Sequence, residues 1–317
     1  MVPDLNEMNR TGRVEAVCLS EKKGTQKSVV QQISLRAGWG AEGDAHAGKW
    51  HRQISLLPKE SIEAFRKQGV EIAYGDFGEN MVISGLDLPR FPVGTRLRIR
   101  SALLEITQIG KACHNSCAIR ERTGDCIMPR DGVFAVVLED GVVKAGDLVE
   151  VIGADPERPF SAAVITLSDR AFSGTYEDLS GPAVAGEIQK NGYEVIEQIL
   201  LPDDREKLEA ELCRLCDQRQ VDVIFTTGGT GLSERDITPE ATLAVCDREV
   251  PGIGEALRAY SANYTANAML SRQTAGIRRR TLIVNLPGSP KACREDLEFL
   301  LKPLRHGLGI LRGTEDH

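Results

Sequence analysis

The chain has 317 residues, 41% hydrophobic and 27% charged, with a formal net charge of −7 at pH 7. This composition excludes a disordered or collagen-like chain, and the length favours two domains. The acidic balance argues against nucleic-acid binding, and no apolar run reaches the ~18 residues that a membrane span needs. Eight cysteines are too few for a disulfide scaffold. Because the polar start also lacks a secretory signal, we expect a cytoplasmic protein with reduced thiols.

The boundary between the two expected domains falls at a composition change. Residues 1–153 carry 20 basic and 20 acidic residues, whereas the remainder carries 19 and 26, so the whole negative balance lies in the second part. Residues 154–160 include two prolines and three charges, which is typical of a short, stiff linker. We therefore predict an N-terminal domain over 1–153 and a C-terminal domain over 161–317.

The first part is rich in short strands. Short segments that are β-branched or alternating, and separated by Gly, Pro or Asp, are typical of strands. The strands that we expect cover 13–19, 33–37, 53–57, 95–100, 102–109, 133–138 and 147–152. A single helix is expected over 59–68, between Pro58 and Gly69. Many strands with one helix predict a mainly-β barrel or sandwich.

Cysteines and cations cluster near the end of this part. Cys113, Cys117 and Cys126 fall within fourteen residues. The neighbouring cations, which would lower a thiol pKa and favour the thiolate, are Lys111, Arg120, Arg122 and Arg130. A thiolate can carry sulfur or bind a metal, but each cysteine could equally be a small buried residue. A zinc site that includes His114 is a further alternative, although its spacing is uncommon.

Two other polar stretches of the first part are 43–57, which could form a ligand-binding loop, and 75–80, a glycine-rich turn. Small residues in 43–57 alternate with Asp44, His46, Lys49 and Arg52. Such a loop could hold an anionic ligand, and an ordinary turn with surface charges is an equal alternative.

The second part alternates strands and helices. The strands that we expect cover 161–167, 193–200, 221–226 and 280–285. The helices between and after them cover 178–191, 204–218, 238–246, 251–268 and 290–302. This alternation predicts a doubly wound α/β sheet with helices on both faces, and ligands then bind at the carboxyl ends of the strands.

Polar loops follow these strands, and we expect them to share one crevice. After the strand 221–226, the glycine cluster at 228–231 could direct its backbone amides at an anion, or could be only a tight connection from strand to helix. Asp203 and Ser289 could instead cap helices, and Asp236 could pair with Arg235. The candidate binding residues of these loops are Ser168, Asp169, Arg170, Asp203, Thr227, Gly228, Gly229, Thr230, Gly231, Asp236, Pro287, Gly288 and Ser289.

The second part resembles the MogA/MoaB family of molybdopterin adenylyltransferases over roughly 161–312. The resemblance rests on SDRAFSG, LPDD, TTGGTGLSERDITPEAT, REVPGIGEALR and LPGSPKA, in this order. It implies a Rossmann-like fold, a homotrimer formed through this domain, and transfer of AMP from Mg-ATP to the terminal phosphate of molybdopterin with release of pyrophosphate. The acids of the LPD and RD motifs are functional in the family, which implies catalytic and Mg²⁺-binding roles for Asp203 and Asp236.

These residue types suit that reaction, because both substrates are anions. Carboxylates can hold a hard divalent cation that neutralises the triphosphate. Backbone amides of the glycine loop can stabilise the non-bridging oxygens as charge shifts. No side-chain nucleophile is required, so catalysis would consist of positioning and electrostatics.

The first part resembles the MOSC domain family over about 12–152. The strings that carry this resemblance are GDAHAGKWHRQISLL, GDFGEN, PVGTRLRI, TQIGKACHNSCAI, RDGVFAVVL and AGDLVEV. It implies a barrel-like fold and a cysteine that carries sulfur or meets the molybdenum cofactor. Cys117 matches that cysteine, and Cys113 is the second candidate. Other molybdenum-cofactor proteins are possible partners, and a non-catalytic carrier of molybdopterin or of the finished cofactor is the alternative function.

Overall fold

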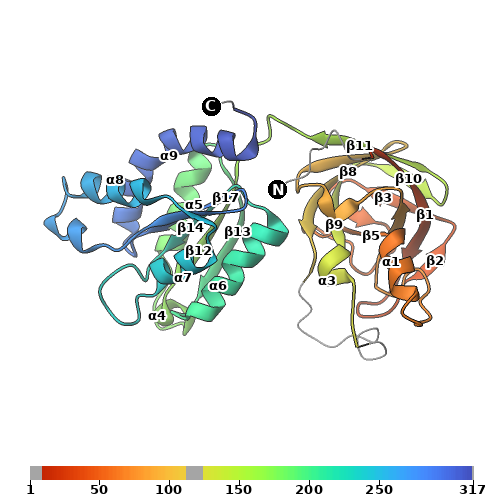
Figure 1. Ribbon diagram of the computed structural model, residues 1–317, viewed down its shortest axis with the longest axis horizontal. Coiled ribbons are helices and arrows are strands. Elements are labelled where there is room, and N and C mark those ends of the chain that lie inside the picture. The colour runs from red at the N-terminus through yellow and green to blue at the C-terminus, as the bar shows by residue number, and fades with distance from the viewer. Residues whose placement is uncertain (1–8, 112–123, 316–317) are drawn as a thin grey trace. The chain divides into compact units, whose positions relative to one another are not determined.

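The computed structural model describes residues 9–111 and 124–315 (Figure 1). The chain divides into two compact units, Met1–Asp155 and Pro156–His317. Each unit has its own hydrophobic core, and each is described by itself below.

The first unit is a closed β-barrel, which confirms the mainly-β, barrel-like expectation. The barrel order is β11-β7-β8-β9-β5-β6-β1, and β1 pairs back with β11 to close it. The barrel strands are β1 (Thr11–Leu19), β5 (Ile54–Pro58), β6 (Met81–Ser84), β7 (Thr95–Ile99), β8 (Ala102–Ile109), β9 (Val133–Glu139) and β11 (Leu148–Ala154). Closure removes the unpaired edges that an open sheet would expose.

Smaller elements surround the barrel. β2 (Ser28–Val30) extends the sheet beside β1, and β10 (Gly141–Lys144), β3 (Gln32–Arg36) and β4 (Gly40–Ala41) form a second sheet. The helical segments are α1 (Lys59–Arg66), η1 (Leu88–Arg90) and α3 (Met128–Asp131). β3 matches the strand expected over 33–37. β2, β4 and β10 were not predicted, because strands of two to four residues are too short to show a period-2 pattern.

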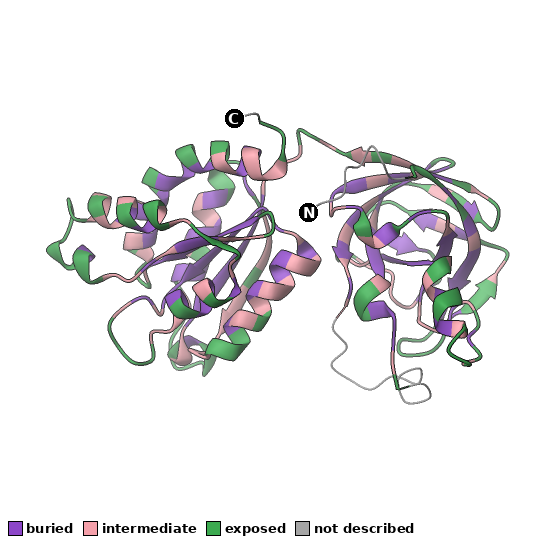
Figure 2. Cartoon of the chain, in the orientation of Figure 1, coloured by how far each residue is buried: buried purple, intermediate pink, exposed green. Residues whose placement is uncertain are grey.

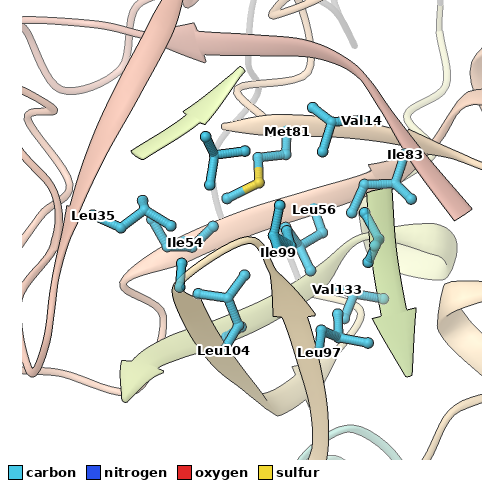
Figure 3. Close-up of a cluster of buried hydrophobic side chains, with 14 of the residues drawn as sticks. Val14, Leu35, Ile54, Leu56, Met81, Ile83, Leu97, Ile99, Leu104 and Val133 are labelled. Atoms are coloured by element: carbon cyan, nitrogen blue, oxygen red, sulfur yellow. The ribbon is translucent and has the colours of Figure 1, made fainter. Parts of the chain in front are cut away.

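Aliphatic side chains fill the barrel interior. Figure 3 shows Leu56, Met81, Leu97 and Val133, from four different strands, gathered in one cluster. Inward and outward residues alternate along β7, where Thr95, Leu97 and Ile99 are buried. Period-2 burial of this kind places one face of each strand in the core.

The second unit is an α/β layer structure around a six-stranded sheet of order β13-β12-β14-β17-β16-β15. β12 (Ser161–Leu167), β13 (Glu194–Leu201), β14 (Val223–Thr227) and β17 (Thr281–Leu286) are parallel, as expected. The antiparallel edge strands β16 (Ala275–Arg278) and β15 (Arg248–Glu249) were not predicted, because they are too short to show a pattern.

Helices cover both faces of this sheet (Figure 1). One face packs on α5 (Ser180–Lys190), α8 (Pro251–Ser261) and α9 (Pro290–Arg312). The other packs on α6 (Arg205–Arg214), its terminal turn η2 (Leu215–Arg219) and α7 (Thr238–Val245). Two short helices, α4 (Asp169–Phe172) and η3 (Ala266–Leu270), complete the unit. Buried strands lie between helices whose outer faces are exposed (Figure 2).

Helix lengths differ from the prediction at two places. The helix expected over 251–268 ends at Ser261, and a separate 3₁₀ turn, η3, follows it. The helix expected to end at 302 continues to Arg312 through Pro303. Proline removes one backbone hydrogen bond, but the buried Leu304 and Leu308 beyond it keep that face packed on the core. None of the described helices is long and apolar enough to cross a membrane.

Candidate active site

The four parallel strands of the second unit end level with one another. In the register of the sheet, Leu167 pairs with Leu201 and Thr227 pairs with Leu286. The loops that follow these strands therefore meet at one edge. A cleft of about 560 Å³ lies there. Among the predicted residues it is lined by Ser168, Asp169, Arg170, Asp203, Gly228, Gly229, Asp236, Gly288 and Ser289.

Gly228 and Gly229 form a turn that only glycine fits. Their φ angles are +96° and +64°, in the left-handed region. A Cβ on Gly228 would lie 2.4 Å from the carbonyl oxygen of Leu167. A Cβ on Gly229 would lie 2.4 Å from Oγ1 of Thr238. The two glycines thus let the chain pass from β14 to the cleft with its backbone exposed to a ligand.

Asp169 and Asp203 form a reciprocal pair, in which each carboxylate accepts the backbone N–H of the other residue. The N–H of Asp169 donates to Oδ2 of Asp203, and the N–H of Asp203 donates to Oδ1 of Asp169, both at 3.0 Å. Arg235 forms an ion pair with Asp169. This reciprocal pair fixes the loops after β12 and β13 to one another.

The two carboxyls of this pair have opposite electrostatic character. The N–H of Asp203 and the Arg235 guanidinium lower the pKa of Asp169 below its usual value. Burial raises the pKa of Asp203, and the nearby charges of Asp169 and Asp236 add to that effect. A cation bound in the cleft would therefore favour the ionised form of Asp203.

Asp236 lies at the end of a loop that follows the glycine turn. Its Oδ2 accepts the N–H of Ser233 at 2.9 Å, and its own N–H donates to the Ser233 carbonyl at 2.9 Å. Arg272 donates to the carbonyl oxygens of Gly231 and Asp236. The carboxylate is half-buried and lines the cleft.

Helix N-termini also face the cleft. Ser180, the first residue of α5, and Pro290, the first of α9, both line it. Asp178 accepts the N–H groups of Ser180 and Gly181 at 3.0 Å each. Helix N-termini carry partial positive charge and favour anionic ligands. The Asp178 acid was not singled out from the sequence, although its place just before a helix start is a capping signal.

The side-chain charge of the cleft is negative. Two arginines, Arg170 and Arg235, line it, against five acids: Asp169, Glu177, Asp178, Asp203 and Asp236. Residues 9–111 and 124–315 hold no group of three or more His, Cys, Asp or Glu arranged to bind a metal by themselves. This negative charge would oppose the binding of a polyanionic ligand unless a cation accompanied it.

Four of the predicted binding residues do not line the cleft. Thr227 is fully buried, and its Oγ1 donates to the carbonyl of Pro287 at 2.7 Å. Thr230 and Gly231 offer their carbonyl oxygens to Arg272. These four residues hold the turn rather than contact the open volume.

The hydrogen bonds test the structural roles that the sequence left open for Asp203, Ser289 and Asp236, namely helix capping and pairing with Arg235. Asp204, not Asp203, caps α6, and it accepts the N–H of Lys207 at 3.1 Å. Ser289 occupies the N-cap position of α9 without a side-chain capping bond. Arg235 pairs with Asp169 and not with Asp236. Helix capping therefore does not account for Asp203, and pairing with Arg235 does not account for Asp236.

The first unit has a smaller cleft, of about 210 Å³, where the two polar stretches of that unit meet. His46, Trp50 and Arg52 come from the first stretch, and Gly78 and Asn80 from the second. The Arg52 guanidinium lies 4.8 Å from the centroid of the Trp50 ring. Lys111 and Cys126 complete the lining, together with other residues.

A buried polar network lies beside that cleft. Lys27 and Asp44 form an ion pair with side chains 1% and 0% exposed. Asn80 donates to Oδ2 of Asp44 at 3.1 Å. Burial opposes the charge on Asp44, but hydrogen bonds from His46 and Lys27 hold its pKa below the usual value. Asp44 is therefore a structural anchor of its loop, whereas His46 and Arg52 face the cleft.

The cysteine predictions are only partly covered by the structure. Cys126 is buried, at 8% exposure, and lines the smaller cleft. Cys117, Cys113 and His114 lie outside the described residues, so the sulfur-carrier and zinc hypotheses remain predictions.

Comparison with known proteins agrees with both halves of the chain. A family model described as "Probable molybdopterin binding domain" matches residues 163–306, and one described as "MOSC domain" matches residues 43–150. The molybdopterin adenylyltransferase of Helicobacter pylori 26695 is 46% identical over 154 residues, which are 48% of this chain and 87% of that protein. The enzyme of that name from Escherichia coli K12 is 45% identical over 138 residues, which are 43% of this chain and 70% of that protein. The crystal structure of MoaB from Thermus thermophilus is 43% identical, covers 49% of this chain and 97% of its own, and has a TM-score of 0.47.

The fold and the cleft define the second unit as an α/β protein with a cleft at the carboxyl edge of its parallel strands. The relatives give that class a name. The chain belongs to the molybdopterin adenylyltransferase family of molybdenum cofactor biosynthesis, the MogA/MoaB type, and carries a MOSC domain in front of it.

Proposed function

We propose that the second unit, a doubly wound, Rossmann-like domain, transfers AMP from Mg-ATP to the terminal phosphate of molybdopterin. An oxygen of that phosphate attacks the α-phosphorus of ATP, a new P–O bond forms, and the bond to the β-phosphate breaks to release pyrophosphate. The observation that carries the proposal is the level ending of four parallel strands, which brings Asp203, the glycine turn and Asp236 to one cleft.

The chain's own groups supply positioning and charge stabilisation. The backbone around Gly228 and Gly229 approaches the ligand volume without a side chain in the way. The N-terminus of α9 lies at the same edge and favours phosphate oxygens, whereas the first N–H groups of α5 already donate to Asp178. Preorganised donors of this kind stabilise the charge that develops on the non-bridging oxygens.

Asp203 and Asp236 are the residues that would hold the Mg²⁺ that accompanies ATP. Five acids against two arginines in the lining make a cation necessary for binding a triphosphate. Two carboxylates fit a cation whose other ligands are phosphate oxygens and water. When bound, the ion neutralises phosphate charge.

The direct test is incubation of the purified chain with molybdopterin and Mg-ATP, followed by mass spectrometry of the product. Adenylylated molybdopterin and one equivalent of pyrophosphate are expected. A chain that binds molybdopterin but releases no pyrophosphate would be the non-catalytic carrier, the alternative function. Light scattering of the same sample tests the proposed homotrimer.

For the first unit we propose cofactor binding or sulfur transfer at the smaller cleft. Arg52 and Lys111 give that cleft two cationic groups, against the one carboxylate of Asp76, and these cations fit an anionic pterin phosphate. Cys117 is the proposed functional thiol, with Cys113 as the second candidate. Cys117→Ser is expected to abolish persulfide loading or cofactor retention and to leave adenylylation unchanged. Stoichiometric zinc in the purified protein would contradict the sulfur role.

A further inference from the structure

One arginine outside the cleft holds the loop that carries Asp236. Arg272 donates through Nε to the carbonyl of Gly231 at 2.6 Å and through Nη2 to the carbonyl of Asp236. Its backbone N–H donates to the carbonyl of Thr230 at 2.9 Å, and Nη1 forms an ion pair with Glu240. A single residue thus contacts the loop 231–236 at its start and at its end.

The loop has little apolar packing to hold it in place. Leu232 is 68% exposed, and Glu234 and Arg235 are exposed as well. Segments with few buried apolar contacts open locally at low free-energy cost. Hydrogen bonds to the loop therefore contribute more to its conformation than they would in a packed segment.

The conformation of this loop matters for both acids of the cleft. Asp236 stands at its end, and Arg235 reaches from it to Asp169. In turn, the Asp169 carboxylate accepts the backbone N–H of Asp203, and the Asp203 carboxylate accepts that of Asp169. A change in the loop would therefore alter the position of Asp236 and the electrostatic surroundings of Asp203 together.

We propose that Arg272 is a positioning residue for adenylyl transfer, acting through the 231–236 loop on the Asp236 carboxylate. The role requires arginine. Its planar guanidinium can donate in three directions at once, whereas the lysine ammonium is a point charge that cannot span both carbonyls and Glu240. This inference rests on the proposed function of the same site.

Substitution at Arg272 and at a matched arginine tests the proposal in the full-length chain. Arg278 is the control, because its guanidinium, like that of Arg272, donates to a backbone carbonyl and pairs with a carboxylate. These partners are the carbonyl of Val245 and the carboxylate of Asp217. Arg272→Lys is expected to lower kcat by on the order of 10- to 100-fold and to raise the Mg²⁺ concentration for half-maximal activity. Arg278→Lys is expected to leave both values within twofold. Glu240→Gln, which keeps the two carbonyl contacts of Arg272, is expected to lower kcat less than threefold.

Hydrogen exchange supplies a readout that does not depend on activity. The Ser233 N–H bonds to Asp236, and the Thr238 N–H bonds to the Gly229 carbonyl at 3.1 Å. In Arg272→Lys we expect at least tenfold faster exchange in 231–238 and unchanged exchange in β12. The proposal would be overturned if residues 231–238 of Arg272→Lys exchanged at the wild-type rate, or if Arg278→Lys lost as much activity as Arg272→Lys. If the wild-type chain transfers no AMP, the proposed function fails, while exchange and Mg-ATP binding in Arg272→Lys still decide the positioning role.

Discussion

The carboxylates at the two edges of the C-terminal sheet differ in their partners: Asp222 at the amino edge is buried, and Asp203 at the carboxyl edge is half-buried. At the amino edge, Asp222 accepts the Ser161 N–H at 2.8 Å and the Arg312 guanidinium at 2.7 Å, and Arg158 lies 3.8 Å away. At the carboxyl edge, Asp203 accepts one N–H from Asp169. Within residues 9–111 and 124–315, no lysine or arginine forms an ion pair with Asp203.

The pKa directions follow from this difference. Burial opposes ionisation of Asp222, but Arg312 and Arg158 hold its pKa below the usual value. Burial dominates at Asp203 and raises its pKa. The chain's own arginines stabilise the ionised form of Asp222, whereas a cation bound in the cleft would do the same for Asp203.

The contrast between a stabilising acid at the amino edge and functional acids at the carboxyl edge fails most clearly if removing a carboxylate at the carboxyl edge leaves catalysis intact. Asp236→Asn keeps the size of the side chain but removes the charge. We expect kcat for adenylyl transfer to fall 100-fold or more, which corresponds to a barrier increase of about 3 kcal/mol. Stopped-time assays of pyrophosphate release measure this loss, and an unchanged melting temperature shows that the fold is intact. Turnover near that of the wild type would remove Asp236 from the machinery.

The reverse experiment is made at the amino edge. Asp222→Asn leaves Arg312 and Arg158 without their shared carboxylate, so we expect the second unit to lose about 3 to 5 kcal/mol of stability. Calorimetry of the full chain measures this as a lower transition temperature. The activity of the folded fraction is expected to stay unchanged, because Asp222 lies at the opposite edge from the cleft.

The pH dependence of that stability has a definite sign. The folded-state pKa of Asp222 is lowered, so its contribution is present above the unfolded-state pKa of about 3.9. It is lost as the pH falls through the folded value. Equal acid sensitivity of wild type and Asp222→Asn would contradict the pairing with the arginines.

The sequence predicted the carboxyl edge well because its signal is local. Asp203, Gly228 and Gly229 directly follow strands, and parallel register brings strand ends together without further information. Arg272 and Asp178 were missed because they act through backbone groups. Arg272 stands 36 positions after Asp236 and bonds to its carbonyl, and such contacts leave no periodic or compositional pattern.

The fold was predictable to a similar extent and for similar reasons. The buried parallel strands and the amphipathic helices follow from periodicity. The closure of the barrel through β1 and β11 depends on a pairing between positions such as Gly12 and Val149, which no local pattern encodes. The cleft of the first unit likewise combines stretches that are distant in sequence, so only the separate polar stretches were predicted.

Glu79 of the first unit extends the comparison to a buried acid away from both edges. Its side chain is fully buried, Oε1 accepts the Gly75 N–H at 2.7 Å, and Oε2 has no hydrogen-bond partner in the described part of the chain. Burial raises the pKa of Glu79 to about 7. The native unit therefore holds a proton that the unfolded chain loses above about pH 4.3, and stability falls as the pH rises toward 7.

Glu79→Gln removes the group that must ionise in the buried site, and with it the loss of stability at high pH. At pH 8 we expect a gain of up to about 4 kcal/mol in the unfolding free energy, and at pH 4 no gain. Both tryptophans, Trp39 and Trp50, lie in the first unit, so denaturant unfolding followed by their fluorescence reports on that unit. Glu63→Gln on the exposed face of α1 is the control and is expected to show no pH-dependent gain. A destabilised Glu79→Gln at pH 8 would show that the ionised carboxylate is satisfied in the fold.

The smallest expected effect concerns the acidic limb of the rate profile. If ionised Asp203 is required, kcat/KM falls as the pH drops through its raised pKa. The Arg235 charge lowers the pKa of Asp203, so Arg235→Gln is expected to move this limb to higher pH. The shift is expected to be under one pH unit, because Arg235 is 65% exposed and an exposed charge is worth at most about 1 kcal/mol. Arg205→Gln changes the net charge equally but removes only an exposed pair with Glu209, and it is expected to leave the limb in place. An equal shift of the acidic limb in both variants would reflect the overall charge of the protein. An acidic limb that shifts in neither variant would assign the titration to a group other than Asp203.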